Sequence, residues 1–336
     1  MTSKPTILVT GGAGYIGSHA VLAFSDAGYP VVVVDDLSTG RRNLVPSFIP
    51  FRKGDVGDMD LMASVIAEHR VGAVVHFAGS IVVPESVSDP LKYYRNNTAN
   101  SRNLIAVCVD TGVSHFVFSS TAAVYGVPDK VPVNEEAPTE PINPYGSSKL
   151  MTEWMLRDVA AAHPFAFAAL RYFNVAGADP MGRTGQSTPL ATHLIKVACE
   201  AATGARRHID VFGEDYDTPD GTCIRDYIHV SDLAEAHVLA LDHLINAGES
   251  FIANCGYGHG YSVREVLTEV QKESGTRLDI RGAPRRPGDP EKLVADPSRI
   301  KKTLCWRPRY DDLGFIVRTA YAWEQKTGAR QLLETA

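Results

Sequence analysis

The chain has 336 residues, of which 44% are hydrophobic and 21% are charged, and its formal net charge at pH 7 is −6. This is the composition of a globular protein of one large or two closely packed domains; its acidic balance disfavours a nucleic-acid-binding surface, and no apolar run approaches the ~20 residues of a membrane helix. Because the five cysteines lack the spacing of a metal site and the apolar start leaves no room for a signal peptide, we expect a cytoplasmic protein with reduced thiols and no bound metal.

Short β-branched runs alternate with amphipathic segments through the first half of the chain. Buried parallel strands are predicted at 6–10, 31–35, 73–78, 115–120 and 167–173. Amphipathic helices are predicted between them at 61–70 and 96–110, and Gly112 is the expected C-cap of the second helix. Because alternation of this kind forms a doubly wound parallel sheet, we predict an α/β fold.

The second half of the chain has a less regular pattern. Loops are predicted at 177–189 and 282–292. The segment 224–244 combines a strand-like piece with a helix for which Ser231 is the expected N-cap, and the tail from about 296 has a mixed helical pattern. We therefore predict a smaller, mixed region built mainly from the second half.

A glycine-rich segment, TGGAGYIG at 10–17, follows the first predicted strand and opens a helix. Its glycines fit both G-x-G-x-x-G and G-x-x-G-x-x-G, through Gly11, Gly12, Gly14 and Gly17. Such a turn lets backbone N–H groups approach a pyrophosphate at the helix N-terminus, whereas the alternative is a purely structural turn. Asp35 lies about 20 residues further on, where a carboxylate accepts the ribose hydroxyls and repels a 2′-phosphate. The pattern favours NAD, although Arg41 and Arg42 leave NADP open.

Tyr145 and Lys149 form a Y-x-x-x-K pair that lies on one face of a predicted helix. The strand upstream ends in FSSTAAVYG (118–126), and strand ends of a doubly wound sheet face the bound dinucleotide, so Ser119, Ser120 and Thr121 are expected near the nicotinamide. A phenol with a pKa of about 10 becomes a useful base when positive charge stabilises the phenolate. The spacing therefore predicts a centre that takes a proton from a substrate hydroxyl, and a solvated surface pair is the alternative.

Eight motifs occur here in the order and spacing of the extended short-chain dehydrogenase/reductases: TGGAGYIGSH, HFAG, YYRNN, SSTAAVYG, PYGSSK, LRYFN, RDYIHVSDLA and PRRPGD. Over nearly the whole chain they look most like the UDP-glucose 4-epimerase family. The resemblance implies a Rossmann domain over 1–174 with 226–254 and a sugar-nucleotide-binding region over 175–225 with 255–336. It also implies tightly held NAD that accepts hydride from C4 of a UDP-sugar and returns it to the other face of the 4-keto sugar.

The same resemblance assigns residues to roles. Tyr145 would be the base, Lys149 would tune it and anchor the ribose, and Thr121 would hold the substrate hydroxyl. NAD would be bound by Gly11, Gly14, Tyr15, Ile16, Gly17, Asp35, Asp36, Leu37, Ser38, Thr39, Gly40, Asp55, Val56, Phe77, Ala78, Gly79, Asn96, Ser119, Tyr145, Lys149 and Phe173. The substrate would be bound by Thr121, Tyr145, Asn174, Leu190, Phe212, Arg225, Arg286, Asp289 and Leu293.

Within the substrate set, Arg225 and Arg286 would clamp the diphosphate, because guanidinium groups match phosphate geometry. Asp289 would hold the uridine ribose. The alternatives are an ion pair of Arg225 with Asp226 or Asp232, and a solvated loop charge for Arg286.

Three positions depart from the family pattern. Ile81 stands where a lysine near the nicotinamide ribose is usual, and Pro189 replaces an asparagine that donates to the substrate. Leu293 stands where a tyrosine walls the sugar pocket, so a UDP-N-acetylhexosamine or a UDP-pentose is an alternative substrate.

Other activities of this fold remain as alternatives. A sugar-nucleotide dehydratase needs an acid and a base directly after the threonine, where this chain has Ala122 and Ala123. A dehydrogenase that releases NADH and a non-catalytic NAD-binding protein are the remaining alternatives. The resemblance also implies a homodimer joined by segments 96–110 and 149–162, unless their apolar faces are core.

Overall fold

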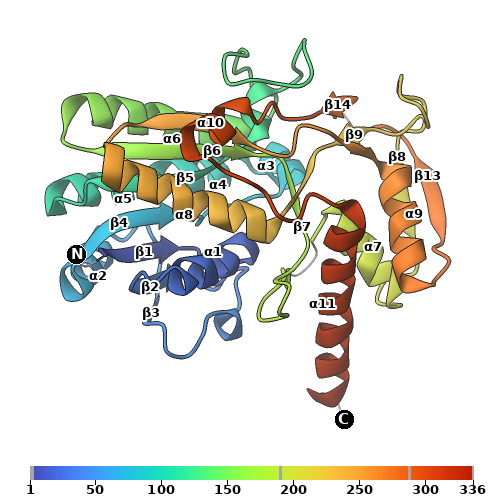
Figure 1. Ribbon diagram of the computed structural model, residues 1–336, viewed down its shortest axis with the longest axis horizontal. Helices are drawn as coiled ribbons and strands as arrows, with labels where there is room; N and C mark the ends of the chain where they lie inside the picture. The colour runs from blue at the N-terminus through green and yellow to red at the C-terminus, as the bar shows by residue number, and fades with distance from the viewer. Residues whose placement is uncertain (1–3, 189–190, 287–288, 335–336) are drawn as a thin grey trace.

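The structure is a computed structural model that describes residues 4–188, 191–286 and 289–334. Within these residues the centre is a parallel sheet of seven strands in the order β11-β6-β5-β4-β1-β2-β3 (Figure 1). The strands are β1 Thr6–Thr10, β2 Val31–Asp35, β3 Phe51–Lys53, β4 Val71–His76, β5 His115–Thr121, β6 Ala166–Tyr172 and β11 Phe251–Cys255. The strand order reverses between β1 and β4, and ligands of such sheets bind beyond the strand ends at this point.

The five predicted strands are present, and one is displaced. β4 begins and ends two residues earlier than the predicted 73–78, so Phe77 and Ala78 follow the strand rather than finish it. Gly72 explains the difference, because a Cβ there would lie 2.8 Å from the Cβ of Pro5. Glycine leaves room for the Pro5 ring at a shift of register, where Thr6 pairs with Val71 and Ile7 with Ala73, so the strand starts before Gly72.

Helices cover both faces of the sheet, because successive side chains of a strand point to opposite faces. Ile7 and Val9 of β1 pack with α1 and α8, whereas Leu8 between them packs with α2, α5 and α6. These helices span α1 Tyr15–Asp26, α2 Met59–His69, α5 Asn100–Thr111, α6 Pro144–Ala162 and α8 Val230–Ala247. The short elements between them are η1 Arg42–Leu44, α3 Val83–Ser88, α4 Pro90–Tyr93, η2 Tyr94–Ala99 and η3 Ala122–Tyr125, and the short helix α10 Ser298–Leu304 follows β14.

Helix ends follow the prediction at one site and contradict it at another. Gly112 caps α5 in the left-handed region, as predicted. Ser231 was wrong as the N-cap of α8: His229 is the cap, and its Nδ1 accepts from the Ser231 N–H at 3.1 Å. The reason is that strand β10, Tyr227–His229, runs straight into α8, which leaves His229 as the last extended residue.

Residues after β6 build a second, mixed region beside the sheet (Figure 1). Its helices are α7 Leu194–Ala202, α9 Val263–Ser274 and α11 Leu313–Glu334, which pack together. Its strands are β7 Asn174–Ala176, β8 Ile209–Phe212, β9 Ile224–Arg225, β10 Tyr227–His229, β12 Tyr261–Ser262, β13 Ile280–Ala283 and β14 Lys292–Leu293, in the small sheets β10-β7, β12-β9-β14 and β13-β8. The segment 282–292 was predicted as one loop, but its ends belong to β13 and β14.

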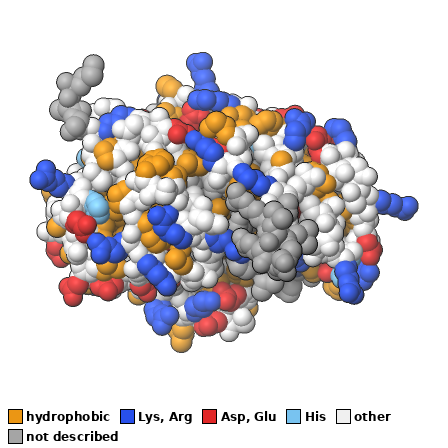
Figure 2. Space-filling model, turned by 90° about the horizontal axis from the view of Figure 1, so that it is seen from below, with side chains coloured by type: hydrophobic (Ala, Val, Ile, Leu, Met, Phe, Trp, Pro, Cys, Tyr) orange, Lys and Arg blue, Asp and Glu red, His pale blue; other side chains and the backbone are white. Residues whose placement is uncertain are grey.

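The surface carries mixed charge. On the face in Figure 2, Lys and Arg side chains are interspersed with Asp and Glu, in keeping with totals of 33 and 39. This mixture differs from the basic stripe typical of a nucleic-acid-binding face. Of the helices in the described part of the chain, none has the length and apolarity that crossing a bilayer demands.

Candidate active site

The turn between β1 and α1 lies at the point where the strand order reverses. Gly11 has a φ of +67°, and a Cβ there would lie 2.6 Å from the backbone nitrogen of Ala78. A Cβ on Gly17 would lie 2.1 Å from the carbonyl oxygen of Gly11, so side chains are excluded at both positions. Gly14 is the N-cap of α1 and supplies no side-chain acceptor to the first turn. This backbone cradle fits the pyrophosphate of a dinucleotide.

Asp35 ends β2 beside this cradle. Its buried carboxylate accepts from the backbone N–H of Ala13 at 2.9 Å and of Leu37 at 2.8 Å. Burial raises the pKa of Asp35, and these two hydrogen bonds oppose the rise. Each oxygen keeps a lone pair for a ribose hydroxyl.

The two arginines that left NADP open are engaged elsewhere. The Nε of Arg41 donates to the carbonyl oxygen of Ser187 at 2.9 Å. Arg42 donates to the carbonyl oxygen of Val45 at 2.8 Å and stacks its guanidinium over the ring of Phe51. Their hydrogen bonds therefore give no support to a site for a 2′-phosphate.

The other predicted cofactor residues differ in how far they are exposed. Val56 and Phe173 are buried, Ile16, Leu37, Gly40, Phe77, Ala78, Gly79 and Asn96 are half-buried, and Asp36, Ser38, Thr39 and Asp55 are exposed. Tyr15 is buried, and its hydroxyl donates to the carbonyl oxygen of Gly177 at 2.7 Å. It therefore joins α1 to the second region.

The sequence analysis did not single out Asn97, which is buried between the segment after β4 and α6. Its side chain accepts from the Ser80 N–H at 2.7 Å and donates to the Ser148 Oγ at 3.0 Å. It thus joins the segment after β4 to α6. Asn96, which was the predicted residue, donates to the Ser80 Oγ at 2.9 Å. The signal available was the pair of adjacent asparagines, which does not reveal which one faces inward.

Tyr145 and Lys149 both project from the buried face of α6. The side chain of Asn143 caps this helix by accepting from the Gly146 N–H at 2.9 Å. Tyr145 is 7% exposed and Lys149 is 3% exposed, so the alternative of a solvated surface pair is wrong. The Nζ of Lys149 donates to the carbonyl oxygen of Ser119, at the end of β5, at 3.0 Å. The structure therefore brings the Y-x-x-x-K pair to the strand end, as predicted.

The pKa values of Tyr145 and Lys149 are shifted in opposite directions from their ordinary values. Burial raises the pKa of Tyr145, and the neighbouring Thr121 hydroxyl opposes the rise. Burial lowers the pKa of Lys149 to about 8, and Glu153 opposes the fall. The hydroxyl of Thr121, rather than the Lys149 ammonium, is thus the group that lowers the pKa of Tyr145 here. The ammonium is directed at the Ser119 carbonyl instead.

The residues after Thr121 form a small apolar wall. Ala122, Val124 and Phe173 lie in one hydrophobic cluster, against which Leu293 packs. A dehydratase needs an acid and a base next to Thr121, and Ala122 and Ala123 supply neither. Leu293 reaches this wall because β14 lies beside β9.

The predicted diphosphate and uridine residues are brought together by the strand pair β9–β14 and the loop before β14. Arg225 is buried and forms an ion pair with Asp289, so the alternative pairing with Asp226 or Asp232 is wrong. Arg286 is exposed, and its guanidinium lies 3.8 Å from the ring centre of Phe212. Pro189 and Leu190 lie outside the described residues.

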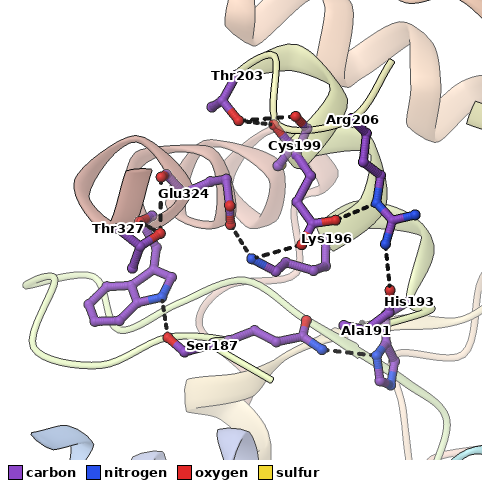
Figure 3. Close-up of polar contacts among 12 residues, drawn as sticks. Ser187, Ala191, His193, Lys196, Cys199, Thr203, Arg206, Glu324 and Thr327 are labelled. Atoms are coloured by element: carbon purple, nitrogen blue, oxygen red, sulfur yellow. Dashed lines mark hydrogen bonds and ion pairs between the residues drawn. The ribbon is translucent and has the colours of Figure 1, made fainter. Parts of the chain in front are cut away.

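Asn174 begins β7 and lines a small cavity with Gln186, His193 and Trp323. Figure 3 shows the polar contacts around it. Lys196 of α7 pairs with Glu324 of α11, and the indole nitrogen of Trp323 donates to the Ser187 Oγ at 3.3 Å. With a volume of about 20 Å³ the cavity has room for a water molecule but not for a sugar. The contacts join Ser187 and α7 to α11.

Comparison with known proteins gives one consistent answer. Residues 7–256 match the NAD dependent epimerase/dehydratase family. The UDP-glucose 4-epimerase of Azospirillum brasilense is 61% identical over 96% of this chain and 93% of its own length. The crystal structure of UDP-glucose 4-epimerase from Brucella ovis in complex with NAD is 45% identical, with a TM-score of 0.92 over 95% of this chain and 98% of that one. The UDP-Glc/GlcNAc 4-epimerase of Campylobacter jejuni is 48% identical, with a TM-score of 0.84 over 96% of this chain and 99% of that one.

Proposed function

The chain belongs to the NAD dependent epimerase/dehydratase family, and from this premise we propose that it is an NAD-dependent UDP-glucose 4-epimerase that interconverts UDP-glucose and UDP-galactose. The observation that carries the proposal is the meeting of Tyr145, Lys149 and Thr121 at the end of β5, with two alanines in place of the acid and base of an elimination. The glycine turn and Asp35 fit NAD.

Proton movement is the task of Tyr145 and Thr121. NAD, held by the glycine turn and Asp35, would supply the hydride acceptor and donor for C4 of the sugar. Tyr145 takes the proton of the 4-hydroxyl and gives it back, with Thr121 orienting that oxygen. Lys149 uses one of its three donors on Ser119 and keeps two for the ribose hydroxyls.

Inversion requires the sugar to turn over while the nucleotide stays in place. Arg286 is exposed and held over Phe212, where its fork is free to meet a phosphate. Arg225 is oriented by Asp289 and also donates to the carbonyl oxygen of Ile224 at 2.8 Å. We propose that these two arginines hold the diphosphate at a distance from C4, while the apolar wall at Leu293 leaves the sugar free to rotate.

The division of labour proposed from the sequence follows the same lines. Residues 1–174 with 226–254 hold NAD, and 175–225 with 255–336 hold the UDP group. It is supported by β11, which pairs with β6 and so completes the large sheet, and by the small sheets that carry Arg225 and Leu293.

A second substrate is favoured by one observation. Leu293 is smaller than a tyrosine and carries no hydroxyl, and it packs at the wall of the site. A relative with 48% identity is described as acting on both UDP-Glc and UDP-GlcNAc. Acceptance of UDP-N-acetylglucosamine beside UDP-glucose is therefore the second candidate.

We also propose a homodimer formed through α5 and α6. Most apolar side chains of these helices lie in the core, including Leu104, Val107 and Leu156. Among the large apolar side chains described on these two helices, Trp154 of α6 is the exposed one: it is 46% exposed, and a side chain of this kind is suited to an interface. A cytoplasmic location is supported by the five cysteines, which are free thiols.

The test is an assay of the purified protein with UDP-glucose, UDP-N-acetylglucosamine and UDP-xylose, each without added NAD. We expect UDP-galactose from UDP-glucose, with no stoichiometric NADH. Accumulation of free NADH would instead identify a dehydrogenase, and a 4-keto-6-deoxy product would identify a dehydratase. Absence of turnover on all three would leave a non-catalytic NAD-binding protein.

A further inference from the structure

A buried ion pair lies one helical turn beyond Lys149. Glu153 of α6 and Arg171 of β6 have side chains that are 2% and 6% exposed, and Arg171 Nη2 lies 2.6 Å from Glu153 Oε2. The Nε of Arg171 also donates to Glu153 Oε1 at 3.0 Å, so the guanidinium fork meets both carboxylate oxygens. Burying two charges costs free energy, and replacing a buried ion pair by apolar residues of similar volume often leaves a protein equally stable or more stable. Stability alone is therefore a weak reason for this pair.

The Glu153–Arg171 pair is hydrogen-bonded to Ser120, near the end of β5. The Oγ of Ser120 donates to Glu153 Oε1 at 2.5 Å, and Ser120 lies opposite Arg171 in the parallel register of β5 and β6. Its neighbours are Ser119, whose carbonyl holds Lys149, and Thr121, whose hydroxyl lies beside Tyr145. The position of Ser120 thus sets the position of both functional neighbours.

The guanidinium also reaches the turn that follows β5. Arg171 Nη1 donates to the hydroxyl of Tyr125 at 3.0 Å, and that hydroxyl donates to Asn254 Oδ1 at 2.7 Å. Tyr125 ends η3, the turn that contains the two alanines after Thr121. Strand β5, η3 and β11 are therefore fixed to one charged pair.

Few charged or titratable groups surround Lys149. Glu153 lies on its own helix, as does Tyr145, with Tyr172 of β6 beside the phenol. His76 of β4 faces it from the sheet, and burial lowers the pKa of His76 to about 3, so this ring is neutral. Glu153 favours the protonated amine, and Arg171 balances Glu153.

Loss of one member would leave the opposite charge buried near Lys149. We propose that the Glu153–Arg171 pair is a positioning element of the active site: it holds the end of β5 through Ser120, and its two opposite charges offset each other beside Lys149. Neither side chain is assigned a contact with substrate or cofactor. The inference rests on the proposed roles of Tyr145 and Lys149.

The experiment compares the alkaline limb of the kcat–pH profile in two variants of the same pair. Glu153→Gln leaves the Arg171 cation, so Lys149 should lose its proton more easily and the limb should move to lower pH by about one unit. Arg171→Gln leaves the Glu153 anion, so the limb should move to higher pH by a similar amount. The double variant lacks both charges and should return the limb towards that of the unmodified protein. A structural role alone predicts lower thermal stability in both single variants without opposite shifts.

A further variant tests the positioning role without changing charge. Ser120→Ala removes the link from β5 to Glu153, while Arg171 still donates to both oxygens. We expect kcat to fall about tenfold, with nucleotide binding and the alkaline limb kept. Shifts in the same direction, or no shift in active single variants, would overturn the charge balance, and an unchanged kcat in Ser120→Ala would overturn the positioning role. If a single variant is too unstable to assay, the double variant and Ser120→Ala decide. Absence of turnover in the unmodified protein would count against the proposed function instead.

Discussion

The ammonium of Lys149 donates to the carbonyl oxygen of Ser119 at 3.0 Å. This hydrogen bond holds the second turn of α6 against the end of β5. Both residues are buried. Helix and sheet are thus joined at the place where a ribose and a substrate hydroxyl are proposed to meet. The geometry requires Tyr145, one turn earlier on α6, to lie at the same strand end.

Replacement of Tyr145 by phenylalanine removes the proposed base and leaves the ring in place. We expect kcat to fall on the order of 10²–10⁴, with UDP binding kept. Steady-state kinetics and calorimetric titration with UDP measure the two effects. Tyr93→Phe is the matched control, because the Tyr93 ring packs edge-on against Tyr145 at 6.5 Å while its hydroxyl donates to the Val82 carbonyl oxygen. It should keep most of the activity, and equal turnover in both variants would remove Tyr145 from its role.

Asp35 is predicted to hold NAD through hydrogen bonds to the ribose. Asp35→Asn takes away the charge and one acceptor, so NAD affinity should fall about tenfold to a hundredfold. The measurement is the NAD content of the purified protein after gel filtration, together with the thermal midpoint with and without added NAD. An unchanged content of bound NAD would contradict this assignment.

The apolar wall at Leu293 is predicted to set the choice of sugar. Leu293→Gly makes room for an N-acetyl group, and the ratio of kcat/KM for UDP-N-acetylglucosamine over UDP-glucose should rise about tenfold. Leu293→Tyr should lower the same ratio. If the ratio is equal in both variants and the unmodified protein, Leu293 does not wall the sugar.

Buried histidines predict a loss of stability in mild acid. His237 is fully buried, and burial lowers its pKa from 6.5 to about 4. Between pH 6.5 and about pH 4, His237 is protonated in the unfolded chain but neutral in the folded protein. The free energy of unfolding therefore falls as the pH falls below 6.5. Relative to His237→Met, the unmodified protein should lose ~1.4 kcal/mol of unfolding free energy per pH unit. Urea unfolding at pH 7 and pH 5 measures the difference, and a constant difference would refute it.

The proposed dimer depends on Trp154. Trp154→Glu places a charge at the interface and should shift the protein to a monomer in analytical ultracentrifugation. Ile245→Glu on α8 is the control, because Ile245 is 37% exposed on another helix. A monomeric unmodified protein, or equal behaviour of the two variants, would contradict this interface.

Local patterns predicted the parts of the molecule that depend on neighbours in sequence. The β-branched runs became strands of the large sheet, and Gly112 ended α5 because its positive φ suits glycine. Sequence spacing alone predicted how the glycine turn follows β1 and how Tyr145 and Lys149 share one face of α6. Asp35 could be predicted in the same way, from its distance along the chain to the glycine turn.

Contacts between distant segments could not be read in this way. Arg225 pairs with Asp289, 64 residues away, because β14 lies parallel to β9. Glu153 meets Arg171 only once β6 packs against β5 and α6 lies over both. His229 caps α8 because β10 pairs with the distant strand β7, where His229 lies opposite Ala176, and this pairing keeps His229 extended up to the start of the helix.

The central claim is that hydride leaves C4 of the sugar and returns to the same carbon without leaving the protein. UDP-glucose with deuterium at C4 tests it most directly, by mass spectrometry and NMR of the UDP-galactose formed without added NAD. The account predicts full retention of deuterium at C4 and no labelled NADH in solution. Deuterium lost to solvent, or found in free NADH, would contradict it.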